Sequence, residues 1–265
     1  MSENLVLSTI ADGVARLTLN RPDKRNALTR EMLAELLARL REIAARTDVR
    51  CVVLAASGPW FCAGMDLTQM QETATRPDAG QVWHTDTQLY LGTVTALFDL
   101  PMPTVAVVQG GAVAGGLGLV LACDMTVAVD AATFALPEPK RGITAAIVTP
   151  LLVHRVGTGP ATWLLLSGEA VDARRAREMG LCQAIAEEGR LEKEVDDLLR
   201  SILSGAPGAL TTSKRQLRAC TAGALKEQLV KAATVSAKAR ETPEAREGLA
   251  AFLEKRPPAW EPKKG

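Results

Sequence analysis

Residues 61–67, FCAGMDL, and residues 110–118, GGAVAGGLG, decide how this chain folds. Each stretch follows a short apolar run that predicts a buried strand, CVVLA at 51–55 and TVAVV at 104–108. Each leads into residues that can begin a helix. Backbone N–H groups at such turns can point at an anion, and glycine lets the backbone come close to it. Two such turns, brought together, would form an oxyanion hole, which stabilises negative charge on a carbonyl oxygen.

The composition predicts a soluble chain with one large core. Of the 265 residues, 47% are hydrophobic and only 3% are aromatic, so the core must consist of Leu, Val, Ile and Ala. No uninterrupted apolar stretch reaches about 18 residues, and MSENLVLSTI at residues 1–10 lacks the features of a signal peptide. We therefore expect a cytoplasmic protein. The five cysteines, at 51, 62, 123, 182 and 220, are scattered and include no CxxC pair. We therefore expect reduced thiols, with neither disulfides nor a metal site.

The first half of the chain alternates strands with helices. Leu5–Ile10 and Val14–Leu19 flank Asp12-Gly13 and predict a hairpin. Thr29 offers an N-cap for a helix whose apolar face comprises Met32, Leu33, Leu36, Leu37, Leu40 and Ile43. Further strands are expected at Val52–Ala55, Val105–Val108 and Met125–Val129. This alternation predicts a mostly parallel, layered α/β fold.

The remainder of the chain is expected to be mainly helical. Thr73–Gly80 predicts a loop before a helix from Val82 to Phe98. Beyond residue 190 strand signals disappear, and the break Ser204–Gly208 divides a core of residues 1–204 from a helical subdomain of residues 205–265. Helices are expected at Leu191–Leu203, Ala209–Cys220, Leu225–Arg240 and Pro243–Lys255.

The charge is unevenly spread although the net charge is only +1. Residues 205–265 hold 12 Lys/Arg and 6 Glu, a balance of +6, which leaves 19 − 24 = −5 for residues 1–204. A basic tail could face phosphates, or it could simply be a solvated helical surface.

Five ordered segments carry a family resemblance: LNRP at 19–22, NAL at 26–28, FCAGMDL, the glycine run that closes in ACD at 122–124, and FALPE at 134–138. Together they resemble the enoyl-CoA hydratase/isomerase (crotonase) family, over roughly residues 5–257. The resemblance implies a layered ββα spiral core with a C-terminal helical oligomerisation subdomain, in a homotrimer or hexamer. It also implies an acyl-CoA thioester substrate and no separate cofactor, because coenzyme A is part of the substrate.

The resemblance assigns three catalytic positions. The backbone N–H groups of Met65 and Gly115 match the family's oxyanion donors, and Glu138 matches one of the two glutamates that hydratases commonly use for acid–base catalysis. The other glutamate aligns with Gly118 and is absent. If a water must be held there, the candidate polar groups are His84, Asp86, Gln88, Lys140 and Arg141.

The binding residues also follow from the resemblance. Contacts with CoA match Lys24, Arg25, Ala27, Ala63, Asp66, Leu67, Phe252 and Lys255. The acyl pocket matches Trp83, His84 and Gly118. The other histidine, His154, is expected to be structural.

Three functions remain open at this point. The first hypothesis is a hydratase of 2-enoyl-CoA thioesters with one glutamate, and the second is an enoyl-CoA double-bond isomerase that uses the same Glu138. The third is a non-catalytic CoA- or RNA-binding family member, although binding to nucleic acid is not favoured because aromatics do not interleave with the basic residues. A dinucleotide site is rejected because the third glycine of G-x-G-x-x-G from Gly116 is missing, and a P-loop because no GK[ST] occurs.

Overall fold

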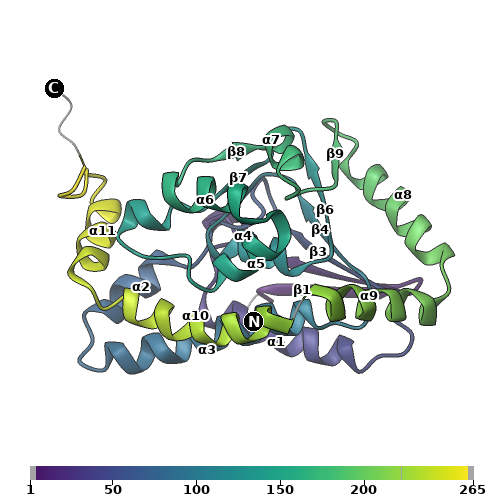
Figure 1. Cartoon of the computed structure of the whole chain (residues 1–265), viewed down its shortest axis with the longest axis horizontal. Coiled ribbons are helices and arrows are strands. Elements are labelled where there is room, and N and C mark those ends of the chain that lie inside the picture. Colours follow the sequence, from purple (N-terminus) through teal and green to yellow (C-terminus); the bar gives the residue numbers. More distant parts are fainter. Residues whose placement is uncertain (1–3, 222, 262–265) are drawn as a thin grey trace.

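A six-stranded sheet in the order β1-β2-β3-β4-β6-β9 forms the centre of the computed structural model, which describes residues 4–221 and 223–261 (Figure 1). β1 and β2 are antiparallel, and every other neighbouring pair is parallel. Helices cover the sheet, so its parallel strands are buried on both faces, which explains their continuous apolar sequences. The strands are β1 (Val6–Ala11), β2 (Val14–Leu19), β3 (Cys51–Ala56), β4 (Thr104–Val108), β6 (Met125–Val129) and β9 (Ala184–Ala186).

A second, smaller sheet holds the glycine run. It contains β5 (Gly111–Val113), β7 (Thr133–Ala135) and β8 (Val171–Asp172), in that order. β5 and β7 are parallel, whereas β7 and β8 are antiparallel. The expected α/β class, hairpin and strands are thus confirmed, within one residue at each end.

Helices account for most of the remaining chain. Thr29 caps α1 by accepting a hydrogen bond from the Met32 N–H at 3.2 Å, and all six predicted apolar residues of this helix are buried. The helices are η1 (Pro22–Lys24), α1 (Arg30–Ala44), α2 (Leu67–Ala74), α3 (Ala79–Phe98), α4 (Gly115–Ala122), η2 (Glu138–Arg141), α5 (Val148–Val156), α6 (Thr158–Ser167), α7 (Ala173–Glu178), α8 (Leu191–Ser204), α9 (Pro207–Thr221), α10 (Gly223–Ala239) and α11 (Pro243–Leu253).

The loop expected at Thr73–Gly80 is present but shorter than predicted, because α2 extends to Ala74 and α3 already begins at Ala79. Asp66 caps α2 by accepting from the backbone N–H groups of residues 68 and 69, at 2.9 and 3.1 Å. Arg30 also donates a hydrogen bond to the Thr73 hydroxyl at 2.6 Å. These polar contacts stabilise a short helix that has little apolar periodicity to reveal it.

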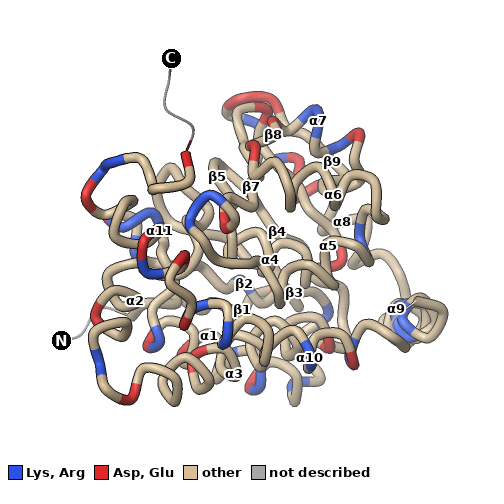
Figure 2. The backbone as a smooth tube through the Cα atoms, turned by 60° about the vertical axis from the view of Figure 1, so that its left-hand side comes forward, with Lys and Arg blue, Asp and Glu red and all other residues tan. Residues whose placement is uncertain are grey.

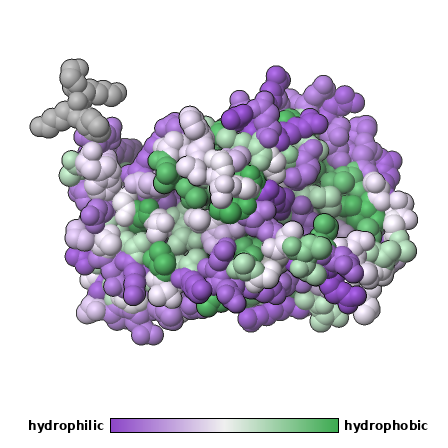
Figure 3. Space-filling model, in the orientation of Figure 1, coloured by the Kyte–Doolittle hydropathy of each residue, from purple (hydrophilic) through white to green (hydrophobic). Residues whose placement is uncertain are grey.

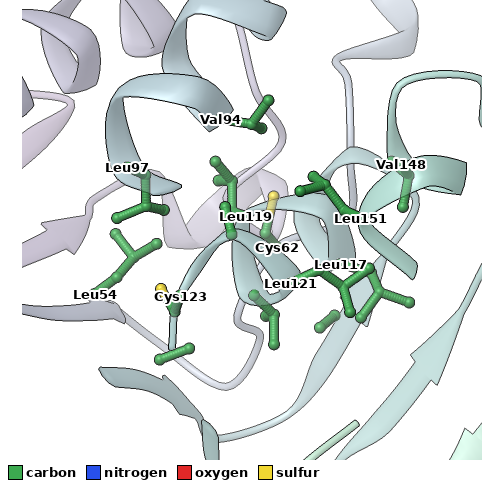
Figure 4. Packing of buried hydrophobic residues seen from close by; sticks show 14 of the residues in the cluster. Leu54, Cys62, Val94, Leu97, Leu117, Leu119, Leu121, Cys123, Val148 and Leu151 are labelled. Atoms are coloured by element: carbon green, nitrogen blue, oxygen red, sulfur yellow. The ribbon is translucent and has the colours of Figure 1, made fainter. Parts of the chain in front are cut away.

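α4 is the most deeply buried helix around the glycine run, with all eight of its residues inside the molecule. Side chains from β3, α3 and α5 surround it in Figure 4, among them Leu54, Val94 and Leu151. A helix that is apolar on every side belongs in a core. Its N-terminus therefore lies well below the surface, where a charge would interact strongly with backbone dipoles.

The C-terminal helices lie within two residues of their predicted bounds. α8 packs against β3 and β6, α10 packs against α3 and α5, and α11 packs against η2 and α2. None of the helices within residues 4–221 and 223–261 is long and apolar enough to cross a membrane. The division at residue 205 stays a prediction.

Part of the basic excess of residues 205–265 neutralises acids of the preceding region. Lys214 on α9, a helix with several basic residues in Figure 2, lies 2.5 Å from Asp124. Lys226 pairs with Asp99 at 2.9 Å, and Arg218 lies between both acids at 3.7–3.8 Å. Lys263 and Lys264 also count toward the excess, but they lie outside the described residues.

Candidate active site

The two glycine-bearing stretches lie side by side. The Cys62 N–H donates to the Gly111 carbonyl at 3.0 Å, and the Cys62 carbonyl accepts from the Val113 N–H at 2.9 Å. Gly64 has a φ of +91°, and a Cβ there would lie only 2.8 Å from that of Ala114 and 3.4 Å from the Gly115 nitrogen. Glycine is therefore required at 64 for both conformation and space. The expectation that the two turns meet is confirmed.

Both proposed donor groups are free at this junction. Neither the Met65 N–H nor the Gly115 N–H donates a hydrogen bond within residues 4–221 and 223–261. Ala114, immediately before α4, has a φ of 53°, which costs about 1–3 kcal/mol at a residue with a side chain. Its N–H is held by the Ala135 carbonyl at 2.9 Å. The strained peptide and the two free donors fit a preorganised oxyanion hole.

Glu138 follows β7 and begins η2, and its side chain is only 5% exposed. Its Oε2 atom is buried without a hydrogen-bond partner. Burial raises the pKa of Glu138 from 4.5 to about 7, although the positive charges of Arg141 and Arg240 oppose the shift. A carboxyl group with this pKa can both accept and donate a proton near neutral pH.

One cavity of about 50 Å³ brings these groups together. Met65, Gly115 and Glu138 all line it, and Glu138 is the only carboxylate among its described lining residues. Most of the remaining wall is apolar and comes from residues 143–148 and from α2. The three predicted catalytic positions therefore share one site, while their roles in a reaction stay predictions.

Tyr90 is a site residue that the sequence did not identify. It is 4% exposed, lines the cavity, and donates from its hydroxyl to the Gly115 carbonyl at 2.6 Å. Burial raises the pKa of Tyr90 well above 10, so it stays protonated. A Cβ at Gly118 would lie 2.0 Å from the tyrosine oxygen. Tyr90 thus fills the space into which a glutamate at 118 would extend.

The acyl-pocket expectations hold only in part. Trp83 is buried and lines a second, smaller chamber of about 20 Å³. His84 is exposed and lines neither chamber, because its position on α3 faces away from the site. Gly118 does not line a chamber either, since Tyr90 stands in front of it.

The other groups considered for holding a water mostly have different roles. Asp86 receives two hydrogen bonds from Arg30, at 2.6 and 2.8 Å. Gln88 is exposed outside the cavity, and Lys140 is exposed and pairs with Glu169. Only Arg141 of these candidates lines the cavity. His154 packs edge-on against Phe98, as expected for a structural residue.

The expected CoA-binding residues form two groups. In the first, the Ala63 N–H donates to the Arg25 carbonyl at 3.0 Å, and the exposed Arg25 guanidinium lies 4.9 Å from the centre of the Trp60 ring. The exposed Lys24 and the half-buried Ala27 adjoin it, and Leu67 lines the cavity. The carboxylate of Asp66 caps α2 and pairs with Arg21 at 2.5 Å. Its backbone N–H donates to the Leu28 carbonyl at 2.9 Å, so its contact with CoA stays a prediction.

The second group lies at the end of α11. Phe252 is exposed, and the Arg141 guanidinium lies 4.4 Å from the centre of its ring. Lys255 is exposed and has a φ of 55°. Since α11 packs against η2 and α2, this group is close to the elements that carry Glu138 and Leu67.

Within the described parts of the chain, no three His, Cys, Asp or Glu side chains are grouped so that they could hold a metal ion. The sequence model of the enoyl-CoA hydratase/isomerase family matches residues 9–263. The chain belongs to this family. Its fold agrees, because an enoyl-CoA hydratase/isomerase of Xanthobacter autotrophicus superposes with a TM-score of 0.86 at 33% identity, over 95% of this chain and 97% of that one.

Relatives within the family carry different names. A Thermus thermophilus protein named "Putative enoyl-CoA hydratase" is 40% identical over 93% of this chain and 97% of its own length. A protein of Escherichia coli named 1,2-epoxyphenylacetyl-CoA isomerase is 30% identical over 96% of this chain and 97% of its own length. Family membership therefore indicates an acyl-CoA substrate and leaves the particular reaction to the site.

Proposed function

We propose that this enzyme adds water to a 2-enoyl-CoA thioester, with Glu138 as its single acid–base group. The observation that carries the proposal is the unpartnered Oε2 of Glu138 in the same cavity as two free backbone donors. This cavity combines a site for a developing oxyanion with a group that can transfer a proton. The family and its hydratase-named relatives support the same class of substrate.

The reaction needs one proton to move twice. The Glu138 carboxylate takes a proton from water as the water oxygen bonds to C3, and the electrons of the double bond move onto the thioester. The Met65 and Gly115 N–H groups stabilise the resulting oxyanion. Glu138 then returns its proton to C2, which restores the carbonyl. A single carboxyl group with a pKa of about 7 can perform both steps, because it is a carboxylate both before the first proton transfer and after the second.

Tyr90 would help to hold the water and one oxyanion donor. The Tyr90 hydroxyl donates a hydrogen bond to the Gly115 carbonyl, and the same hydroxyl oxygen can accept a hydrogen bond from water. The bond to residue 115 also fixes the strained turn that precedes α4. Tyr90 thus offers a polar contact where the second glutamate of other hydratases is absent.

The second candidate is an isomerase that moves the double bond of a 3-enoyl-CoA. One observation favours it: a single carboxylate lines the described cavity, and moving a proton from C2 to C4 requires only one. The same two N–H groups would stabilise the dienolate. A non-catalytic CoA- or RNA-binding role is less well supported, because it does not explain why a carboxyl group is buried in the cavity without a hydrogen-bond partner for Oε2.

We further propose a homotrimer or hexamer in which coenzyme A enters only as part of the substrate. Large apolar side chains stay exposed on several helices besides α11, and Figure 3 shows separate hydrophobic patches among polar surface. These side chains are Trp163 and Leu166 on α6, Leu217 on α9, and Val230 and Val235 on α10. Contact with neighbouring subunits would remove them from water.

The test is to incubate the purified protein with crotonyl-CoA and, separately, with 3-hexenoyl-CoA. Hydration removes the absorbance of the conjugated thioester, isomerisation creates it, and mass spectrometry identifies the products. The proposal expects rapid formation of 3-hydroxybutyryl-CoA. Glu138→Gln should slow this reaction by about 10²-fold or more, and Glu169→Gln, at an exposed ion pair, should leave it unchanged. Conversion of 3-hexenoyl-CoA alone would establish the isomerase, and no conversion of either would reject both reactions.

A further inference from the structure

The chamber that holds Glu138 continues into the second chamber. Five residues line both, which places them along the boundary: Leu67, Met70, Arg141, Ile143 and Arg240. Beyond this boundary the wall is mainly apolar and includes Trp83 and Leu249. An acyl chain whose reacting carbons lie at Glu138 would therefore meet two arginines at its far end.

Arg240 follows α10 and lies against α3. Its guanidinium is 5.6 Å from the centre of the Trp83 ring, and its Nη1 atom is buried without a hydrogen-bond partner. It forms no ion pair within the described residues, and the nearby Asp86 already receives two hydrogen bonds from Arg30. A buried donor without an acceptor is unfavourable. An anion that enters the chamber would remove this penalty.

Arg141 gives the boundary a second positive charge. It lies 4.4 Å from the Phe252 ring and also forms no ion pair within residues 4–221 and 223–261. The third arginine of the second chamber, Arg246, is exposed at its edge. Three arginines thus line the two chambers, whereas Glu138 is the only carboxylate that lines either of them in the described chain. The far end of the acyl site is therefore positive.

We propose that the preferred acyl group carries a carboxylate at its far end, and that the Arg240 guanidinium binds this carboxylate with help from Arg141. This inference rests on the proposed function, because it takes the cavity as an acyl-CoA site. A guanidinium presents two parallel N–H donors that match a carboxylate, and low polarity strengthens such a bond. A methyl-ended chain would leave Nη1 desolvated and unpaired.

The phosphates of CoA are a poorer match for Arg240. This guanidinium lines the chamber that holds Glu138 and Tyr90, at its boundary with the second chamber. The phosphates of CoA are separated from the thioester by the whole pantetheine arm. An arginine at this boundary is thus placed to contact the end of an acyl chain whose reacting carbons lie at Glu138.

The test compares two ligands that differ only at the end of the chain. Hexanoyl-CoA and adipyl-CoA, both saturated, are titrated into the wild type and into Arg240→Met by calorimetry. The wild type should bind adipyl-CoA about 10–100-fold more tightly, the range expected of a hydrogen bond to a charged group. Arg240→Met should bring the ratio of the two dissociation constants close to one, and Arg240→Lys should give an intermediate ratio. Equal binding of both ligands by the wild type would overturn the proposal, even if the variants do not fold.

Two further results distinguish this inference from the proposed function. If Arg240→Met raises the dissociation constants of both ligands by the same factor, the arginine binds the CoA part that they share, and the carboxylate proposal is wrong. If adipyl-CoA is favoured through Arg240 but neither 2-hexenoyl-CoA nor 2-hexenedioyl-CoA is hydrated, the inference stands and the hydratase assignment fails. If hydration does occur, kcat/KM should favour 2-hexenedioyl-CoA by a similar factor, and this preference should disappear in Arg240→Met.

Discussion

Glu138→Gln separates the electrostatic role of this residue from its shape. Glutamine keeps the size of the side chain but cannot exchange a proton, so turnover should fall by about 10²-fold or more. In the wild type, kcat/KM for hydration should rise with pH through about 7, because the carboxylate is the form that takes a proton from water. The residual activity of the variant should lack this rise.

The same variant makes a prediction about stability. The pKa of Glu138 is raised from 4.5 to about 7 in the folded protein, so folding favours its protonated form. That stabilisation is fully present below pH 4.5 and is lost as the pH rises through 7. Each pKa unit corresponds to about 1.4 kcal/mol, which gives a loss of about 2.5 kcal/mol between pH 5 and pH 8. Glutamine does not titrate and escapes this loss.

Urea unfolding at pH 5 and pH 8 measures the effect. The free energy of unfolding of Glu138→Gln minus that of the wild type should be about 2.5 kcal/mol larger at pH 8 than at pH 5, which means that the variant gains stability relative to the wild type. Glu169→Gln serves as the control, because that carboxylate is exposed and should show no such difference. An equal effect of Glu138→Gln at both pH values would refute the reasoning about burial.

Three further predictions follow from the site and its surroundings. Tyr90→Phe removes the hydrogen bond to the Gly115 carbonyl, and kcat for hydration should fall about 2–10-fold; an unchanged kcat would exclude Tyr90 from the mechanism. Gly118→Ala places a methyl group against the Tyr90 hydroxyl and should lower the free energy of unfolding by about 1–3 kcal/mol. Adding Tyr90→Phe should restore part of this loss in denaturant titrations, whereas strictly additive losses would contradict the proposed clash. Deletion of residues 207–265 exposes the apolar face of α3 and should give insoluble or monomeric, inactive protein; light scattering that detects a stable, active full-length monomer would contradict the proposed assembly.

The sequence predicted the parts of the fold that depend on local signals. Continuous apolar runs identified β3 and β4, and the spacing of leucines together with Thr29 identified α1. α2 was missed because it is stabilised by the Asp66 cap and by contacts with Arg30. The contacts with Arg30 join residues that are far apart in the sequence, which no local pattern reports, whereas the Asp66 cap is a local signal that the prediction did not use.

The same limit applies to the site. The glycine segments were found from the apolar runs that precede them and Glu138 through resemblance to a family, and the structure places Met65, Gly115 and Glu138 at one cavity. Tyr90 was missed because its role depends on meeting Gly118 from a different helix, although it is the only tyrosine in the chain. Arg240 directly follows α10, near the charged Lys238 and Glu241, so the sequence gave no sign that its side chain lines the cavity.

The central claim is that Glu138 transfers a proton between water and C2 of an acyl-CoA thioester. Deuterium incorporation tests it most directly, with crotonyl-CoA as substrate in D₂O and the product analysed by NMR. The wild type should give 3-hydroxybutyryl-CoA with one deuterium at C2, and Glu138→Gln should form this product at least about 100-fold more slowly. Incorporation at an unchanged rate in Glu138→Gln, or no reaction of the wild type, would contradict the account.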